Sequence, residues 1–395
     1  MTQGLHQSVR ERAEKAGSSA DLGVCPPESS QVVLVFQGGG ALGAYQAGVF
    51  QALQDEGISP DWVIGTSIGA INAALIAGNT PENRLPRLRE FWRRVRHHPF
   101  AQYLAGAPLF GRLVADAVII TGGIPGFFEP NPLAAFGVNC RLGPEMSAYY
   151  KTAPLERTLS ELINFEILND GPMRLTVGAA DLSSGEMRYF DSRHERLTPR
   201  HILASCALPP AFPAVRIDDV LYWDGGVLSN TPVEAVFDDN PRRSGLVFVV
   251  HMWNPDGPEP DTLAKVVARE KDVRYSSRAV NHIARQMQIH NLRRVVAELA
   301  ERLPQPVRDD PQVRELSAYG CQTRMHVVRL LAPALEGESY TKDIDFTGEG
   351  VSARWDAGFE DTTRVLRTKP WEGDFDPAEG FILHEATGGT MVFHG

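Results

Sequence analysis

Ser67 lies at the centre of the pentapeptide Gly65-Thr66-Ser67-Ile68-Gly69, which has the Gly-x-Ser-x-Gly pattern of a nucleophile elbow. A tight turn that lifts the serine hydroxyl clear of the backbone has no space for Cβ atoms at the positions of Gly65 and Gly69. The hydroxyl then stands at a helix N-terminus, where the helix dipole favours negative charge. The pentapeptide is common by chance, but here it follows an apolar run and precedes an alanine-rich one. In that context it predicts that Ser67 is a nucleophile.

A second loop, Gly38-Gly39-Gly40-Ala41-Leu42-Gly43, also follows an apolar run and precedes a helical pattern. The backbone N–H groups of such a loop point at an anion, which can be a phosphate or the oxyanion that forms when an ester is attacked. The Gly-x-Gly-x-x-Gly spacing also matches a dinucleotide fingerprint, which requires an acidic residue at the end of the second strand. Here Asp61 lies at the start of that strand, which argues against dinucleotide binding.

The third loop is Asp224-Gly225-Gly226, a carboxylate at the end of a short apolar run. Alone it is typical of a tight turn. Together the loops predict a chemical step in which Ser67 attacks a carbonyl, Asp224 takes the hydroxyl proton, and the N–H groups of Gly38 to Gly40 hold the oxyanion. A carboxylate is a weak base near pH 7 unless its pKa is raised, and we expect a partly apolar pocket beside Trp223 to raise it.

Strands and helices alternate around these loops. Short β-branched runs predict strands, and the first two are each followed by a helical pattern, which indicates an α/β fold with a mostly parallel central sheet. The composition divides the chain into a flexible leader (1–30), a catalytic domain (31–256) and a mixed, helix-rich C-terminal extension (257–395). The predicted elements nearest the loops are the strands 32–36 and 62–64, the helices 41–54 and 70–77, and the later strands 174–179, 187–190 and 246–251.

The three loops, in this order within residues 38–226, resemble the patatin-like phospholipase family. The segment 204–212 resembles the family's Ala-Ser-x-Ala-x-Pro-x-x-Phe stretch before the catalytic aspartate. The resemblance implies a three-layer fold and hydrolysis of lipid acyl esters by a Ser-Asp dyad without histidine. It assigns Ser67 as nucleophile, Asp224 as base and Gly38, Gly39 and Gly40 as the oxyanion hole. The glycines that support these motifs are Gly43, Gly65, Gly69, Gly225 and Gly226.

Two features lie outside the common family pattern. Many members carry arginine in the glycine-rich loop where this chain has Leu42, so charge complementarity to a phospholipid headgroup is open. The region after residue 256 resembles the C-terminal extension of a bacterial subgroup, including the stretches 342–346 and 354–358. That resemblance implies no function for the extension.

Two other functions remain open from the residues. The order Ser67, Asp224, His251 matches a conventional esterase triad, with His251 at the end of an apolar strand. A non-catalytic lipid-binding scaffold is the second alternative. The remaining histidines show no metal-ligand spacing, so we expect neither a metal nor an organic cofactor.

The composition and net charge limit which partners and which cellular compartment we expect. The net charge of −10 argues against general binding to nucleic acid, because phosphates would be repelled over most of the surface. The chain has four scattered cysteines and no apolar signal segment, so we expect free thiols and a cytoplasmic protein. The expected partner is a lipid or other acyl-ester substrate.

Two segments of the sequence are compatible with a peripheral contact to a membrane. The aromatic-rich insertion 100–137 fits either an acyl pocket or bilayer contact, or else ordinary core under a loop. The basic helical stretch 261–302 fits anionic lipid, a partner protein or a solvated face.

Overall fold

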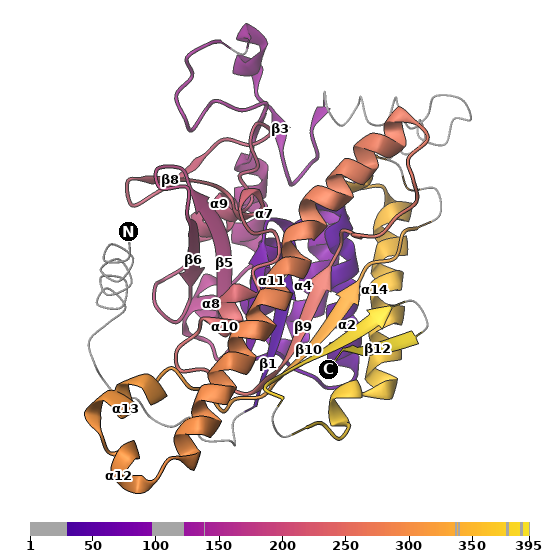
Figure 1. Ribbon diagram of the computed structural model, residues 1–395. Coiled ribbons are helices and arrows are strands. Elements are labelled where there is room, and N and C mark those ends of the chain that lie inside the picture. Colours follow the sequence, from indigo (N-terminus) through magenta and orange to yellow (C-terminus); the bar gives the residue numbers. More distant parts are fainter. Residues whose placement is uncertain are drawn as a thin grey trace.

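The structure is a computed structural model that describes residues 30–96, 122–137, 139–335, 338, 340–376, 379–387 and 390–394 (Figure 1). The predicted leader lies outside these residues except for Ser30. Part of the predicted aromatic-rich insertion also lies outside them, including Phe100, Tyr103 and Phe110. The described chain therefore begins immediately before the first predicted strand.

Ten strands of the described chain form one sheet, and six of them run parallel through its centre. They are β1 (Gln31–Phe36), β2 (Trp62–Thr66), β5 (Arg174–Asp181), β6 (Met187–Asp191), β7 (Val215–Ile217), β8 (Val220–Asp224), β9 (Gly245–His251), β10 (Met325–Leu331), β11 (Phe381–Thr387) and β12 (Thr390–His394). The order is β12-β11-β10-β9-β1-β2-β5-β8-β7, with β6 also paired to β5. A short separate ladder joins β3 (Glu129–Pro130) to β4 (Tyr150–Lys151). The predicted α/β class with a mostly parallel sheet is confirmed.

Helices cover both faces of this sheet. The described α-helices are α2 (Ala44–Asp55), α3 (Ile68–Ala77), α4 (Pro81–Arg94), α7 (Ala153–Leu162), α8 (Phe165–Asp170), α9 (Pro199–Ser205), α10 (Glu234–Phe237), α11 (Leu263–Arg302), α12 (Gln305–Arg308), α13 (Pro311–Ser317) and α14 (Gly348–Thr368). Leu34 and Phe36 of β1 pack in one core cluster with α2 and α3, whereas Val33 and Val35 pack in another with α10 and α11. Side chains alternate between the faces of a strand, so both faces of β1 are buried. The continuous apolar run in the sequence follows from this three-layer arrangement (Figure 1).

The region predicted as an extension continues the same sheet. Strand β10 pairs in parallel with β9, and β11 and β12 follow beyond it. Helix α14 packs directly on α2, so that a side chain at Gly48 would meet the backbone of Trp355. Residue 256 thus marks a change of composition within one fold, because the edge of β9 is paired with β10 rather than left free.

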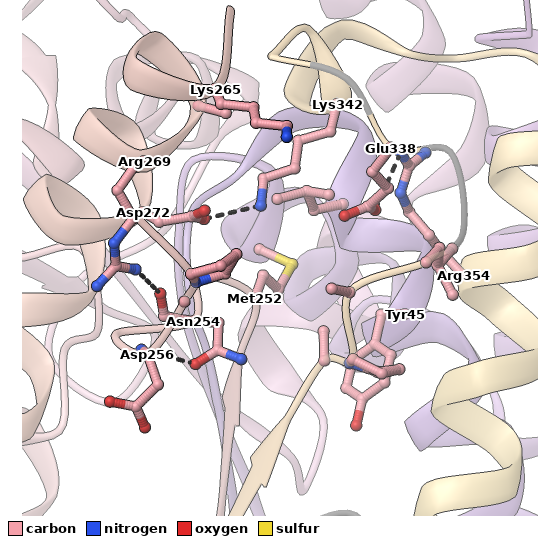
Figure 2. Close-up of a pocket in the computed structure, with 18 of the residues that line it drawn as sticks. Tyr45, Met252, Asn254, Asp256, Lys265, Arg269, Asp272, Glu338, Lys342 and Arg354 are labelled. Carbon is pink, nitrogen blue, oxygen red and sulfur yellow. Dashed lines mark hydrogen bonds and ion pairs between the residues drawn. The ribbon is translucent and has the colours of Figure 1, made fainter. Parts of the chain in front are cut away.

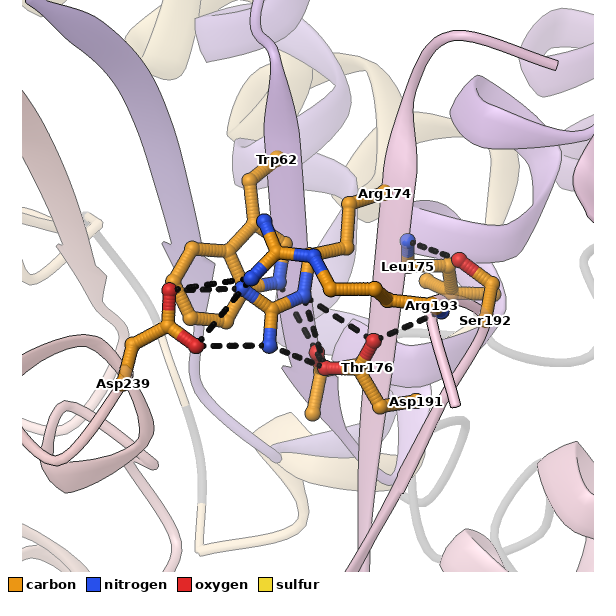
Figure 3. Close-up of polar contacts among 8 residues, drawn as sticks. All are labelled: Trp62, Arg174, Leu175, Thr176, Asp191, Ser192, Arg193 and Asp239. Carbon is orange, nitrogen blue, oxygen red and sulfur yellow. Dashed lines mark hydrogen bonds and ion pairs between the residues drawn. The ribbon is translucent and has the colours of Figure 1, made fainter. Parts of the chain in front are cut away.

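A buried ion cluster joins β5, β6 and the segment before β9 (Figure 3). The guanidinium of Arg174 lies 2.8 Å from Asp191 and 2.8 Å from Asp239. Its carbon is 3.7 Å from the centre of the Trp62 ring. Each of the buried charges has a partner of opposite sign, so the cluster fixes the β5–β6 hairpin against the amino-terminal end of β2.

The described part of the aromatic-rich insertion belongs partly to the core. The rings of Phe127 and Phe128 are buried and lie 6.1 and 5.4 Å from the ring of Phe212. The Tyr150 ring lies 4.6 Å from that of Phe128. Phe136, in contrast, is 74% exposed. Two of the aromatic residues are therefore explained by packing under a loop, and one is left on the surface.

Candidate active site

Ser67 occupies the sharp turn between β2 and α3, as predicted. Its φ of 57° and ψ of −127° are uncommon for a residue with a side chain. The turn is tight because a Cβ on Gly65 would collide with the backbone of Gly69. The N–H of Ser67 donates to both the carbonyl oxygen and the Oγ of Ser205, at 3.2 and 3.1 Å. Ser205, which closes α9, therefore holds the strained backbone from outside the turn.

The sheet register brings Asp224 to this turn. Strand β5 pairs with β6 along one edge, and both β2 and β8 pair with its other edge. On that edge Thr66 lies opposite Gly178, and Asp224 lies opposite the next residue, Ala179. Asp224, the last residue of β8, therefore lies next to Ser67, the residue that follows β2. The two predicted catalytic residues are adjacent because they share one edge of β5.

The carboxyl group of Asp224 has the properties of a base that works near neutral pH. It is 1% exposed, and burial raises its pKa to about 7, although the Ser67 hydroxyl and the Gly226 N–H oppose the shift. The N–H of Gly226 donates to Oδ1 at 2.7 Å. The other oxygen, Oδ2, is buried and has no partner of good hydrogen-bond geometry among the described residues. One oxygen is thus anchored and the other is unpaired in the part of the chain that the structure describes, and the Ser67 hydroxyl lies close enough to the carboxyl group to lower its pKa.

The predicted source of this pKa shift is wrong in one respect. Trp223 is 36% exposed, whereas Asp224 is buried. Consecutive residues of a strand point to opposite faces, so the indole does not wall the carboxylate. The backbone N–H of Asp224 instead donates to the carbonyl of Ala207 at 3.0 Å, and the buried Cys206 thiol lies near enough for the two groups to interact electrostatically. The segment after α9 therefore contributes to the burial.

The glycine-rich loop lies directly beside Ser67. A Cβ on Gly38 would be 3.1 Å from the Cβ of Ser67. The N–H of Gly38 donates to the carbonyl of Asn230 at 3.1 Å, so this donor is already used. The N–H groups of Gly39 and Gly40 have no acceptor within the described residues. Gly40 has a φ of 57°, a conformation that favours glycine. The free donors of the loop are thus at its second and third glycines.

The other predicted motif glycines allow close packing around the pair. Gly43 contacts the side chain of Ile68, since a Cβ there would lie 2.6 Å from Cγ1. Gly69 packs on the end of β1, and Gly225 packs on β5, where a Cβ would lie 2.5 Å from the carbonyl oxygen of Gly178. These glycines let the three loops approach one another at backbone distance.

A buried amide network, which the sequence reasoning missed, supports the glycine-rich loop. The Oε1 of Gln37 accepts from the N–H of Met252 at 2.6 Å, which ties the start of the loop to the end of β9. The carbonyl of Gln37 accepts from Gln46 at 2.7 Å, and Gln46 accepts from Asn72 at 2.9 Å. Asn230 also donates to the carbonyl of Gly38, at 3.0 Å. Polar residues inside the apolar patterns of α2 and α3 were the available signal, because a buried amide requires partners.

His251, the third member of the alternative triad, does not reach the pair. It ends β9, which is separated from β2 by β1. Its ring is 1% exposed, and burial together with the nearby Arg329 lowers its pKa to about 3. Within the described chain, Nε2 has no hydrogen-bond partner. The structure therefore brings together Ser67, Asp224 and the glycine-rich loop, and leaves His251 on a different strand.

Several cations of α11 contact other parts of the molecule, whereas Lys265 and Arg274 form exposed pairs with Asp261 and Glu270. Lys271 pairs with Asp343 at 2.6 Å. Arg293 donates to the carbonyl of Phe237, and Arg294 donates to that of Gln322, each at 3.1 Å. These contacts favour a packing role over a solvated face for this part of the helix.

No helix within the described ranges is long and apolar enough to cross a membrane.

A cavity of about 190 Å³ lies on the other side of the glycine-rich loop (Figure 2). Leu42 and Met252 form its border with the loop, since both contact the position of Gly39. Its described lining includes neither Ser67 nor Asp224. The described residues also contain no group of three His, Cys, Asp or Glu side chains that could share a metal ion. The cavity is thus separate from the three loops that carry the predicted site residues.

A family model described as patatin-like phospholipase matches residues 34–237, which is more than half of the chain. The chain belongs to the patatin-like phospholipase family. A second family model, described as patatin phospholipase, matches residues 273–378 in the C-terminal region. The patatin-like core and the added strands and helices are thus both similar to known phospholipase families.

Curated relatives of this patatin-like chain are distant. An uncharacterised protein of Bacillus subtilis, YqhO, is 27% identical over 217 residues, which are 50% of this chain and 64% of the relative. The lysophospholipase nte1 of Aspergillus terreus is 25% identical over 265 residues, which are 60% of this chain but 14% of the relative. The chain therefore spans less than two thirds of these relatives. Among solved structures, VipD of Legionella pneumophila gives a TM-score of 0.36 at 16% identity, covering 89% of this chain and 69% of VipD.

Proposed function

We propose that this patatin-like phospholipase is a serine acyl hydrolase that cleaves lipid esters with a Ser67–Asp224 dyad. One observation carries the proposal. Asp224 is buried with a pKa raised to about 7, it keeps one oxygen that is unpaired among the residues that the structure describes, and its carboxyl group interacts with the hydroxyl of a serine held in a strained turn. A buried carboxylate with no cationic partner is costly for folding, so its position beside a nucleophile indicates a function.

In the acylation step, Oγ of Ser67 attacks the ester carbonyl carbon while its proton passes to Oδ2 of Asp224. The carbonyl oxygen becomes an oxyanion, which the N–H groups of Gly39 and Gly40 stabilise. The N–H of Ile68, at the start of α3, adds a donor and the positive end of the helix dipole. The alcohol then leaves with the proton from Asp224, and the acyl group remains on Ser67.

In the deacylation step, Asp224 takes a proton from a water molecule, and the resulting hydroxide attacks the acyl carbon. The same donors stabilise the second oxyanion. Its collapse breaks the bond to Oγ, which recovers the proton held by Asp224, and the carboxylic acid is released. The two steps use one carboxyl group in turn as base and acid, which a pKa near 7 allows.

A lipid ester is the substrate class that the family description supports. The lysophospholipase name of a distant relative points to the same class. Leu42 is buried and borders the cavity rather than the dyad, so this chain places no cation at that position of its loop. We therefore propose that the acyl chain and the ester carbonyl, more than an anionic headgroup at Leu42, determine binding. A peripheral contact with a membrane remains a prediction.

Labelling with a fluorophosphonate probe tests the proposal. Wild-type protein should form one adduct that mass mapping locates on Ser67. Ser67→Ala should form none, and Asp224→Asn should label at least 100-fold more slowly while remaining folded, because general base catalysis contributes about 10²–10⁴-fold. A folded wild-type protein that forms no adduct on Ser67 would refute the dyad and favour a non-catalytic lipid-binding scaffold.

A further inference from the structure

One close contact between the C-terminal region and the glycine-rich loop is made by the 3-10 turn η4 (Lys342–Ile344). The carbonyl oxygen of Asp343 occupies the place where a Cβ on Gly40 would lie. The backbone of η4 therefore packs directly on the backbone of the loop, with no side chain between them. A displacement of η4 would consequently move the N–H of Gly40, one of the donors assigned to the oxyanion.

Two reciprocal ion pairs hold η4 to α11. The Nζ of Lys271 lies 2.6 Å from Oδ1 of Asp343, and the Nζ of Lys342 lies 2.7 Å from Oδ1 of Asp272. Each element thus contributes one Lys-Asp dipeptide, and the two dipeptides exchange partners. The four side chains are between 11% and 25% exposed, so water and salt screen them less than they screen surface pairs. We call these four residues the Lys-Asp clamp, and Figure 2 shows its Lys342–Asp272 half.

The Lys-Asp clamp also reaches the first glycine of the loop through Trp253. The ammonium of Lys342 lies 5.4 Å from the centre of the Trp253 ring, whose Nε1 donates to the carbonyl of Gly38 at 2.8 Å. On α11, the ring of Tyr275 lies 4.8 Å from the Trp253 ring. The carbonyl of Tyr275 accepts from the side chain of Gln37 at 3.2 Å. The start of the loop and Gly40 are therefore both linked to elements that the clamp joins.

The chain beyond η4 is anchored independently. Phe346 is 2% exposed, and its ring lies 6.1 Å from the ring of Trp92 in a stacked arrangement. The Nε1 of Trp92 donates to Asn72, which donates in turn to the carbonyl of Gly43 at the end of the glycine-rich loop. Since Phe346 fixes the far side of η4, loss of the clamp is expected to release η4 locally without detaching the whole C-terminal region.

We propose that the C-terminal region positions the oxyanion hole, and that the Lys-Asp clamp is the device that does so. Lys271, Asp272, Lys342 and Asp343 are positioning residues that act through the backbone of Gly40 and through Trp253. The inference rests on the proposed function, because positioning the loop matters only if the loop stabilises an oxyanion. It gives the region that matches the second family model a role in the reaction itself.

The expected effect is on the chemical step. Removal of one oxyanion donor costs about 10²–10³ in kcat, and a donor that is displaced rather than removed keeps part of its effect. We therefore expect a loss of about tenfold in kcat for a nitrophenyl ester when one pair of the clamp is broken. The KM should stay unchanged, because the interaction strengthens only in the transition state.

The test is a charge exchange. Lys271→Asp and Asp343→Lys should each lose about tenfold in kcat and label more slowly with fluorophosphonate. The double variant, which restores opposite charges, should recover most of the loss, and Lys271→Arg should remain close to wild type. If Asp343→Lys does not fold, Lys271→Gln and Asp272→Asn replace it, because each removes one partner of an ion pair without adding a charge. Each should show the same loss in kcat and in labelling rate.

Arg329→Met is the matched control. Arg329 pairs with Glu385 at 2.6 Å, and the two side chains are 13% and 18% exposed, so the control removes a pair of similar burial elsewhere in the C-terminal region. It should lower the melting temperature to a similar degree and leave kcat unchanged. The inference is overturned if folded clamp variants keep wild-type kcat, if the exchange does not recover it, or if the control loses as much. Wild-type protein without ester hydrolysis or Ser67 labelling would instead reject the proposed function, and the inference with it.

Discussion

The raised pKa of Asp224 makes a quantitative prediction about pH. Only the carboxylate can take the proton of Ser67, so acylation should increase with pH and reach a plateau above the pKa of about 7. At pH 5, two units below that value, about 1% of the protein carries the carboxylate, and the rate should be about 100-fold below the plateau. An ordinary aspartate, with a pKa near 3.8, would already be more than nine-tenths ionised at pH 5 and would give a nearly flat profile.

The assay is the second-order rate of fluorophosphonate labelling between pH 5 and 9, with circular dichroism at each pH to show that the protein is folded. Labelling reports acylation alone, so deacylation and product release do not distort the profile. Asp224→Asn is the control, and its residual rate should not follow the same titration. A wild-type profile that is flat from pH 5 to 8 would refute the assignment of Asp224 as a buried base.

Three further predictions follow from particular contacts. Because the folded pKa of Asp224 is raised, its ionisation destabilises the fold as pH rises towards 7, by about 4 kcal/mol at the plateau. Asp224→Asn should therefore raise the melting temperature more at pH 8 than at pH 5, and an equal change at both pH values would contradict this. Arg174→Met leaves the buried Asp191 without its cation and leaves Asp239 only the longer pair with Arg193, at 3.3 Å. It should cost about 3–5 kcal/mol in urea denaturation, whereas a cost below about 1 kcal/mol would show a negligible role. His251→Gln should label at the wild-type rate, and a folded variant as slow as Asp224→Asn would restore the triad.

Local chemistry in the sequence was sufficient to predict the elements around the candidate site and the turn that carries Ser67. The apolar run that became β1 predicted a doubly buried strand, and a parallel sheet explains it. The glycines around Ser67 predicted a tight strand-to-helix turn, and the turn is there because their missing Cβ atoms are a local requirement. Patterns of this kind are visible in sequence because their cause lies within a few residues.

The support of the site was not predictable in the same way. Ser205 belongs to the segment that resembles the family pattern, but nothing local in the sequence indicates that it accepts a hydrogen bond from the N–H of Ser67. The charge run of α11 predicts a lipid-facing surface, a partner contact or a solvated face, and nothing in it indicates that Lys271 and Asp272 bind partners about 70 residues further along the chain. Adjacency in the sequence predicts Trp223 as a wall of the Asp224 pocket, but consecutive strand residues point to opposite faces, so the indole lies on the other face.

The sequence by itself determined which groups this protein has for chemistry: a serine in a glycine-bounded turn, a carboxylate at a strand end and a loop of glycine amides. The tertiary structure decided how they are used. The edge of β5 joins Ser67 to Asp224, burial sets the pKa of the carboxylate, and strands added beyond β9 bring η4 onto Gly40. The physical reason for this division is the distance along the chain over which each property is set. Turn geometry depends on neighbouring residues, whereas strand register, desolvation and ion pairing depend on residues that only the folded chain brings together.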